Sequence, residues 1–263
     1  MYERPEVPEL QFTDAEGEPI PYGDRWGAGG PPEATYSRTR HPERFAPLID
    51  HARALVDYLA STYDVDVTVT EGLPADAPVA LARYEHGQVA VARTTSVVPR
   101  NSLAAPLHLA ETTFPTVVLA VGAAGAERAP ACGCDACDES LEGCIEELEH
   151  LVLAVADGRF QERYTWTDGI ETSFAGAWGG QASRTPRQAA SKESIEALKH
   201  GQRARHGERW QPWTRLEDLD RDPSPLGHER SRPRRIVDED RVLRLLKERA
   251  ARGFGRHRGT RSA

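Results

Sequence analysis

Four cysteines, all that the 263-residue chain contains, lie within residues 132–144. Cys132, Cys134, Cys137 and Cys144 follow a C-x-C-x2-C-x6-C spacing, in which Gly133 relieves backbone crowding between the first two. Thiolates are good zinc ligands, and structural zinc sites usually take four of them or a mixture with histidine. The spacing therefore predicts a zinc site held by Cys132, Cys134, Cys137 and Cys144.

The fourth ligand is the open point of this prediction. Residues 138–157 carry apolar side chains at helical spacing, and Cys144 falls on the same face as Leu141 and Leu148. A small cysteine on such a face is equally well explained as a buried core residue. The residues that can replace it as fourth ligand are His150, Asp135, Asp138, His86 and His108.

Two other roles fit the same thiols: structural cysteines without a metal, and redox chemistry. A redox role requires a reactive thiolate, and Cys137 would lie at a helix N-terminus, which lowers a thiol pKa. Asp135, Asp138 and Glu139 oppose this role, because nearby carboxylates disfavour another negative charge. The surrounding sequence also lacks a thioredoxin-like βαβ pattern. Zinc is the favoured interpretation, and the other two remain open.

The elements that must position these residues are two helices and a sheet. Residues 42–62 and 138–157 each carry an apolar stripe at helical spacing. Between them lie short β-branched or alternating segments, expected as strands at 65–70, 79–82, 88–96, 107–110 and 117–121. Because the connections are too short for helical crossovers, we expect a mainly antiparallel sheet. The predicted fold is α+β, with four to five strands packed by the two helices.

The chain divides into a central domain and two extensions. Residues 1–36 are rich in Glu, Pro and Gly and are expected to form a disordered arm, so the domain is placed at 37–215. Within it we expect a hairpin over 164–174, a helix over 185–201 and a compact aromatic turn at Trp210-Gln-Pro-Trp213. Residues 216–263 are expected to be a charged linker, a short helix over 238–251 and a flexible basic tail.

Charge and hydropathy bear on location and partners. The net charge is −8, but residues 229–263 carry 11 Arg and 1 Lys against 5 acids, which leaves −15 for the remainder. Because Phe254 is the only aromatic residue of this tail, we favour a solvated arm over a nucleic-acid contact. The start of the chain lacks the apolar run of a signal peptide, and no apolar run is long enough for a membrane span. We expect a cytoplasmic protein with a protein partner and no membrane.

The sequence also resembles an uncharacterised family of actinobacterial proteins, known only as a domain of unknown function. The resemblance covers roughly residues 36–215 and rests on Tyr36-Ser-Arg-Thr-Arg-His-Pro-Glu-Arg-Phe-Ala-Pro-Leu48, the Phe114-Pro115 turn and Cys132-Gly-Cys-Asp-Ala-Cys-Asp-Glu139. Cys144 lies outside the family motif. The resemblance implies domain limits and no activity, cofactor or partner.

Two classes of function follow from these observations. Because the chain lacks a G-x-S-x-G elbow, an H-E-x-x-H pair, a G-x-G-x-x-G loop and a Walker loop, we favour a non-catalytic binding or scaffold module with a structural zinc or cysteine cluster. The alternative is a zinc-dependent hydrolase or a thiol oxidoreductase that uses Cys132, Cys134 and Cys137. In that hydrolase a water would occupy the open zinc position, and Asp135 or Asp138 would act as base.

Overall fold

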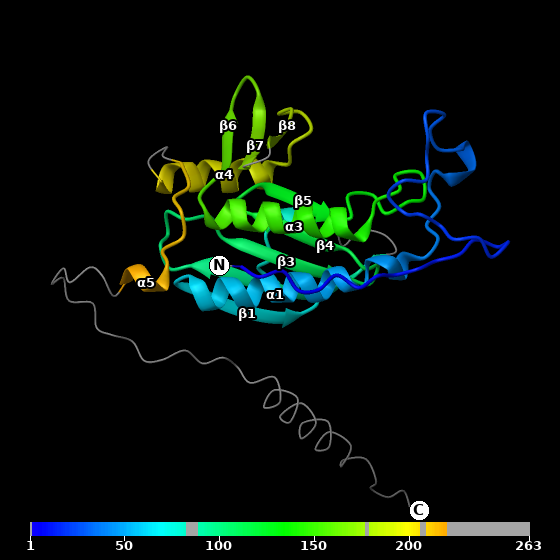
Figure 1. The fold of residues 1–263 in the computed structure, drawn as a ribbon. Helices are drawn as coiled ribbons and strands as arrows, with labels where there is room; N and C mark the ends of the chain where they lie inside the picture. Colours follow the sequence, from blue (N-terminus) through cyan, green and yellow to red (C-terminus); the bar gives the residue numbers. More distant parts are fainter. Residues whose placement is uncertain (1, 83–88, 177–178, 206–208, 220–263) are drawn as a thin grey trace, which may run out of the picture. The chain divides into compact units, whose positions relative to one another are not determined.

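The first half of the chain builds a five-stranded sheet in the computed structural model, which describes residues 2–82, 89–176, 179–205 and 209–219. All of these residues belong to one unit, Met1–Asp222. Figure 1 shows the elements in chain order. They are η1 (Glu33–Thr35), η2 (Pro42–Phe45), α1 (Pro47–Thr62), β1 (Val65–Glu71), α2 (Val79–Ala82), β2 (Val91–Pro99), β3 (Leu107–Thr112), β4 (Val117–Val121), β5 (Gly125–Ala129), α3 (Leu141–Ala156), β6 (Phe160–Thr165), β7 (Gly169–Gly176), β8 (Gly179–Thr185), α4 (Lys192–Ala204) and α5 (Leu216–Leu219).

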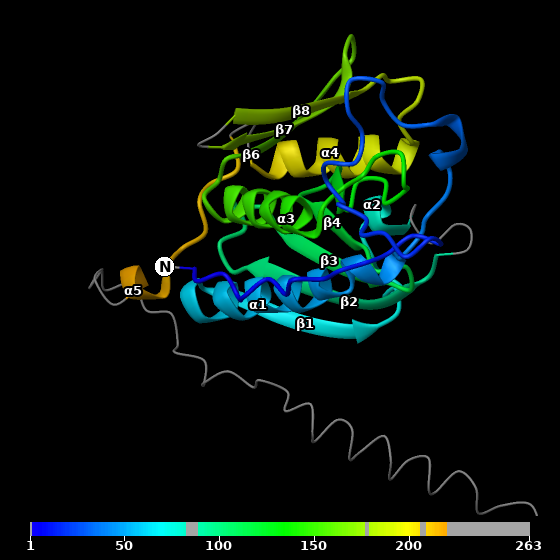
Figure 2. The same cartoon turned by 45° about the vertical axis from the view of Figure 1, so that its right-hand side comes forward.

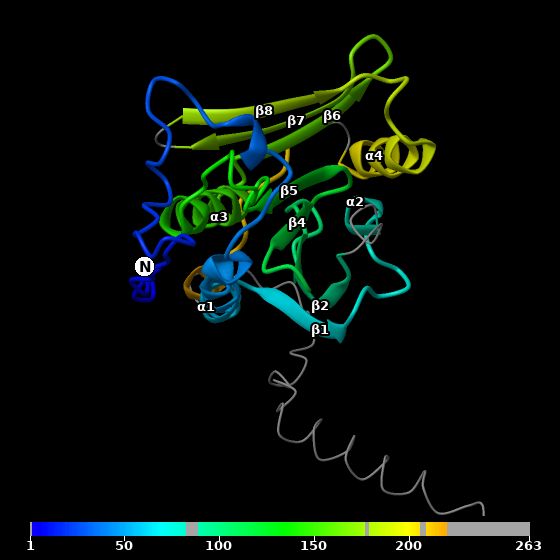
Figure 3. The same ribbon diagram turned by 90° about the vertical axis from the view of Figure 1, so that its right-hand side faces the viewer.

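The five-stranded sheet is an antiparallel meander of order β1-β2-β3-β4-β5, which confirms the predicted fold class. Strand β4, between β3 and β5, is buried on both faces. Val117, Leu119 and Val121 face the main core, whereas Val118 and Ala120 face a smaller cluster around α2. Figure 3 shows α1 and α3 on one side of this sheet and α2 on the other.

Residues 79–82 form the short helix α2, not the strand that their apolar character predicted. Pro78 precedes the segment, and its carbonyl accepts hydrogen bonds from the N–H groups of Leu81 and Ala82, as in a first helical turn. A four-residue apolar run fits a buried strand and a buried helix equally well. Here the helix buries Ala80 and Leu81 against the second face of the sheet.

A second antiparallel sheet, β6-β7-β8, packs on α3 and α4 (Figure 2). The predicted hairpin over 164–174 is confirmed within its first two strands. The third strand of this sheet, β8, was not predicted, because residues 179–185 contain almost no apolar side chains. The helix expected at 185–201 instead begins at Lys192, where the Ser191 side chain accepts a hydrogen bond from the N–H of Ser194.

The aromatic turn predicted at 210–213 packs on the domain. Trp213 is buried, and its indole N–H donates to the carbonyl oxygen of Ala105 at 2.9 Å. Gly158, just after α3, has φ +70°, and a Cβ built there would lie 2.6 Å from the backbone nitrogen of Pro212. Only glycine therefore lets the end of α3 approach this turn so closely.

The N-terminal segment differs from the predicted disordered arm, because its described residues have defined contacts with the domain. Arg4 forms a bidentate ion pair with Glu149 of α3, in which its Nε and Nη2 atoms lie 2.9 and 2.6 Å from the carboxylate oxygens. His51 of α1 lies 3.3 Å from the carbonyl oxygen of Pro5. The segment then reaches the loop that contains the cysteines, where Arg25 and Trp26 form hydrogen bonds. Specific ion pairs of this kind leave no trace in amino-acid composition.

The remaining predictions concern residues 216–263 and membrane-spanning helices. The linker expected from residue 216 begins with the short helix α5, and the helix expected over 238–251 and the basic tail at 229–263 lie outside the described residues. Among the described helices, none has both the length and the apolar character needed to cross a bilayer.

Candidate metal centre

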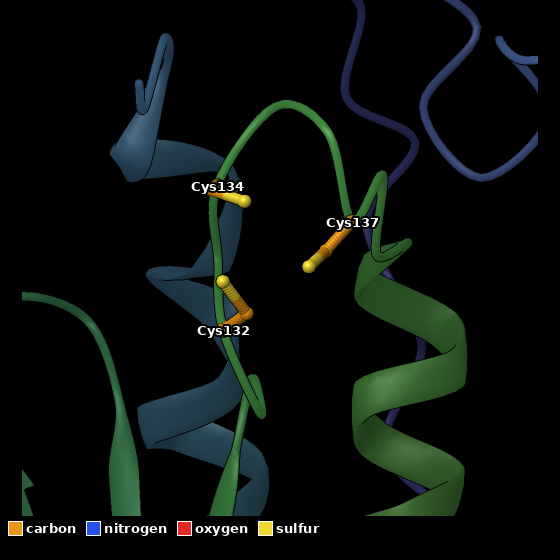
Figure 4. Close-up of side chains that lie close together, drawn as sticks. All are labelled: Cys132, Cys134 and Cys137. Carbon is orange, nitrogen blue, oxygen red and sulfur yellow. The ribbon is translucent and has the colours of Figure 1, made fainter. Parts of the chain in front are cut away.

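Residues 130–140 form the loop that joins β5 to α3, and this loop brings three of the four cysteines together. Figure 4 shows the side chains of Cys132, Cys134 and Cys137 pointing toward one another. The loop turns at Gly133, which has φ +78° and packs against the ring of Phe114. A Cβ at this position would lie 3.1 Å from that ring, so the tight step between the first two cysteines depends on glycine.

The three sulfur atoms have the separations that a single metal ion requires. The Sγ atoms of Cys132, Cys134 and Cys137 all lie within 4.8 Å of one another. Zinc–sulfur bonds of about 2.3 Å in a tetrahedron place neighbouring sulfurs roughly 3.8 Å apart. Small rotations of the side chains are enough to close the three sulfurs onto one ion. The cluster therefore fits a thiophilic metal such as zinc.

Hydrogen bonds within the cluster make the three thiols unequal. Burial raises the pKa of Cys134, but hydrogen bonds from the Cys132 thiol and from the backbone N–H groups of Cys137 and Ala136 outweigh burial, so this pKa is lowered. The pKa of Cys137 is raised to about 12, first by its thiol hydrogen bonds to Cys132 and Cys134 and then by burial. Cys134 thus loses its proton more readily than Cys137, and a bound cation would favour deprotonation of the thiols that hold it.

Cys144, expected as the fourth ligand, is not part of this group. It lies in the first turns of α3, is 3% exposed and packs in the main core. Burial, reinforced by the negative charges of Glu139 and Glu147, raises the pKa of its thiol to about 12. Because its sulfur lies outside the group of three and its side chain packs among apolar residues, the structure gives Cys144 the role of a small core residue.

The carboxylates next to the cysteines are already engaged. Glu139 accepts three backbone N–H hydrogen bonds, from Ala131, Cys132 and Gly133, at 2.6 to 3.0 Å. Asp135 is buried and accepts the N–H of Arg40 at 3.0 Å. These two side chains hold the shape of the loop and do not extend toward the sulfurs as ligands.

Asp138 is also engaged, and it does not cap α3 although it lies just before this helix. Its carboxylate accepts the backbone N–H of Arg25 at 2.8 Å and the Nε–H of the same residue at 2.7 Å. Its backbone has a left-handed φ of +53°. Ser140 caps the helix instead, with its hydroxyl accepting from the N–H of Gly143 at 3.1 Å.

Arginines complete the surroundings of the loop. The Arg25 guanidinium stacks on the rings of Tyr22 and Trp26, and it also donates to the carbonyl oxygen of Asp135. Arg44 is 2% exposed, and its side chain donates to the backbone carbonyl of Gly133 at 3.1 Å. These residues come from the segment before α1, and their distance in the sequence from the cysteines explains why motif analysis missed them.

Arg44 is a buried cation without a carboxylate in contact. Its side-chain hydrogen bonds go to the backbone carbonyls of Arg40, His41 and Gly133, and no carboxylate in the described part of the chain forms an ion pair with it. Burial lowers the pKa of its guanidinium. The loop therefore has a buried positive charge beneath it, which the nearby Asp135 carboxylate favours and which an anionic group at the three sulfurs would favour further.

None of the predicted histidine substitutes joins the sulfurs in the described residues. His108 lies in β3, where its Nδ1 is 2.8 Å from the hydroxyl of Ser96. His150 lies in the C-terminal half of α3, and His86 falls outside the described residues. The three-cysteine group thus has no fourth ligand among the residues that the structure describes.

Comparison with known proteins identifies a family but no activity. A model described as "Family of unknown function (DUF6226)" matches residues 8–217, which include the N-terminal segment, the cysteine loop and both sheets. No curated protein and no solved structure matches the chain.

Proposed function

The chain belongs to DUF6226, a family of unknown function, and we propose that it is a non-catalytic binding or scaffold module that binds one zinc ion through Cys132, Cys134 and Cys137. The observation that carries the proposal is the approach of the three sulfurs to within 4.8 Å of one another. The lowered pKa of Cys134, to which two backbone N–H groups donate, supports the thiolate form that a metal needs.

The ion would cross-link three parts of the fold. Cys132 and Cys134 follow β5, and Cys137 precedes α3. The segment before α1 forms hydrogen bonds with the same loop through Arg25 and Arg44. Fixing the loop would therefore fix the start of α3 and the N-terminal segment together. Structural zinc contributes directly to folding free energy in this way.

The engaged carboxylates favour this role over catalysis. A zinc hydrolase needs a base beside the metal-bound water, and the side chains nearest in sequence, Asp135, Asp138 and Glu139, are occupied by hydrogen bonds. Three thiolates also donate so much charge that zinc becomes a poor Lewis acid. The thiol oxidoreductase alternative gains no support from Cys137, whose raised pKa opposes reactivity. We also propose a cytoplasmic setting, where thiols stay reduced and free to bind metal.

Elemental analysis of protein purified without chelator tests the proposal. We expect about one zinc per chain in the wild type and in Cys144→Ser, and loss of zinc in Cys134→Ser. Cys144→Ser is the matched control, because it removes a thiol outside the group of three. Zinc far below one per chain, with all four native thiols freely titratable, would overturn the metal site.

A second measurement separates the module from the enzyme alternative. Untargeted metabolite screening should detect no turnover by the zinc-loaded protein. Turnover that disappears in Cys134→Ser while its circular dichroism spectrum stays unchanged would instead establish a catalytic centre.

A further inference from the structure

We infer that the zinc ion of this site takes its fourth ligand from another molecule, as the neutral imidazole of a partner protein's histidine. The inference rests on the proposed function, since it requires a metal at the three cysteines. It adds the chemistry by which the module would recognise its partner.

The first step is that the open side of the site faces solvent. Cys132 and Cys137 are exposed, whereas Cys134 is buried at 8% exposure. A metal held by these three sulfurs would be covered by protein on the Cys134 side and accessible on the other. A tetrahedral ion held by three sulfurs would have one remaining position, and the exposure of Cys132 and Cys137 would leave that position open to solvent.

The second step is that the described residues offer no side chain for this position. The cysteine group contains no histidine or carboxylate, and Cys144 is held in the core. Asp135 and Asp138 would have to leave Arg40 and Arg25 to reach a metal. Among the described residues, this position is therefore left to an external ligand.

The third step is the charge balance, which selects the kind of ligand. Zinc with three thiolates would carry one net negative charge beside the Glu139 carboxylate, which accepts the N–H groups of Cys132 and Gly133, and the buried Arg44 guanidinium beneath the loop offsets only one of these charges. A fourth thiolate would add an unbalanced negative charge close to Asp138 and Glu139. A neutral imidazole adds none, and it is the commonest metal ligand among side chains.

Cobalt(II) replacement in the full-length chain tests this inference, because cobalt absorbs visible light according to its ligands. Added imidazole should shift the visible ligand-field bands in a saturable way and leave the thiolate-to-cobalt charge-transfer intensity of three sulfurs unchanged. N-acetylcysteine should bind about tenfold more weakly than imidazole at neutral pH. Cys144→Ser is the matched control and should give the same titration as the wild type.

Three results would overturn the inference. The first is a charge-transfer intensity of four thiolates that falls in Cys144→Ser, because the chain would then complete its own site. The second is a nitrogen ligand already present in the purified protein, and the third is an unchanged spectrum or a preference for N-acetylcysteine. Failure of the protein to bind cobalt or zinc at all is a different result, because it refutes the proposed metal site itself.

Discussion

The contact between Arg25 and Asp138 anchors the N-terminal segment, and replacing Asp138 measures how strongly. The pair is nearly buried, with side-chain exposures of 10% and 8%, and the Asp138 carboxylate accepts two hydrogen bonds from Arg25. Losing two bonds to a charged group costs about 2 kcal/mol in this setting, because the guanidinium keeps its contacts with Tyr22, Trp26 and the Asp135 carbonyl.

The backbone at Asp138 adds a second, separable cost. Its φ of +53° is tolerated by Asp, Asn and Gly but costs about 1 kcal/mol more for alanine. We therefore expect Asp138→Ala to lower the free energy of unfolding by about 3 kcal/mol, Asp138→Gly by about 2 and Asp138→Asn by about 1. The order of the three variants separates the ion pair from the backbone conformation.

Urea unfolding followed by circular dichroism, with zinc content measured in each sample, is the assay. A double-mutant cycle with Arg25→Met should give a coupling of about 1–2 kcal/mol between the two side chains. An Asp138→Ala variant within about 0.5 kcal/mol of the wild type would refute the reasoning, as would additive effects in the cycle. Equal effects of glycine and alanine would refute the backbone part alone.

Three further predictions concern other positions. Replacing Cys144 by alanine should leave zinc content unchanged and cost about 1 kcal/mol in urea unfolding, because it removes one buried core atom; loss of zinc would show that Cys144 is a ligand. Burial lowers the pKa of His108 in the folded state, so the unfolded state takes up the proton at a higher pH. The free energy of unfolding should therefore fall as the pH drops below about 6.5, and His108→Gln should flatten this dependence. An unchanged pH profile in that variant would contradict the assignment. Replacing Ser140, the N-cap of α3, by alanine should cost about 1 kcal/mol, and no loss of thermal stability would disprove the cap.

The sheet and its helices could be predicted because their patterns are local. Val65, Val67 and Val69 alternate with polar residues, and β1 covers this segment. The stripe of α3 likewise follows its apolar spacing. Two errors have different causes. Residues 79–82 are helical because a short apolar run fits a helix as well as a strand, and β8 was missed because it has no apolar alternation.

The grouping of three cysteines was predictable from the sequence, but the residues that surround them were not. The spacing of Cys132, Cys134 and Cys137 in the sequence was enough to bring their sulfurs together, because all three lie on one short loop. The helical stripe also raised the possibility that Cys144 belongs to the core. Arg25 and Arg44, in contrast, reach the loop from positions about a hundred residues earlier, and no spacing rule connects such distant partners.

The separation of these partners along the chain has a consequence for synthesis. Each strand of the five-stranded sheet pairs with the next strand, so the hairpins can close soon after they emerge from the ribosome. Arg25 instead can form its contact only after Asp138, 113 positions later, has been synthesised, and Arg4 only after Glu149, 145 positions later. The N-terminal segment can therefore complete these contacts only after the five-stranded sheet has been synthesised, and its amides should exchange hydrogen sooner than those of the central strands.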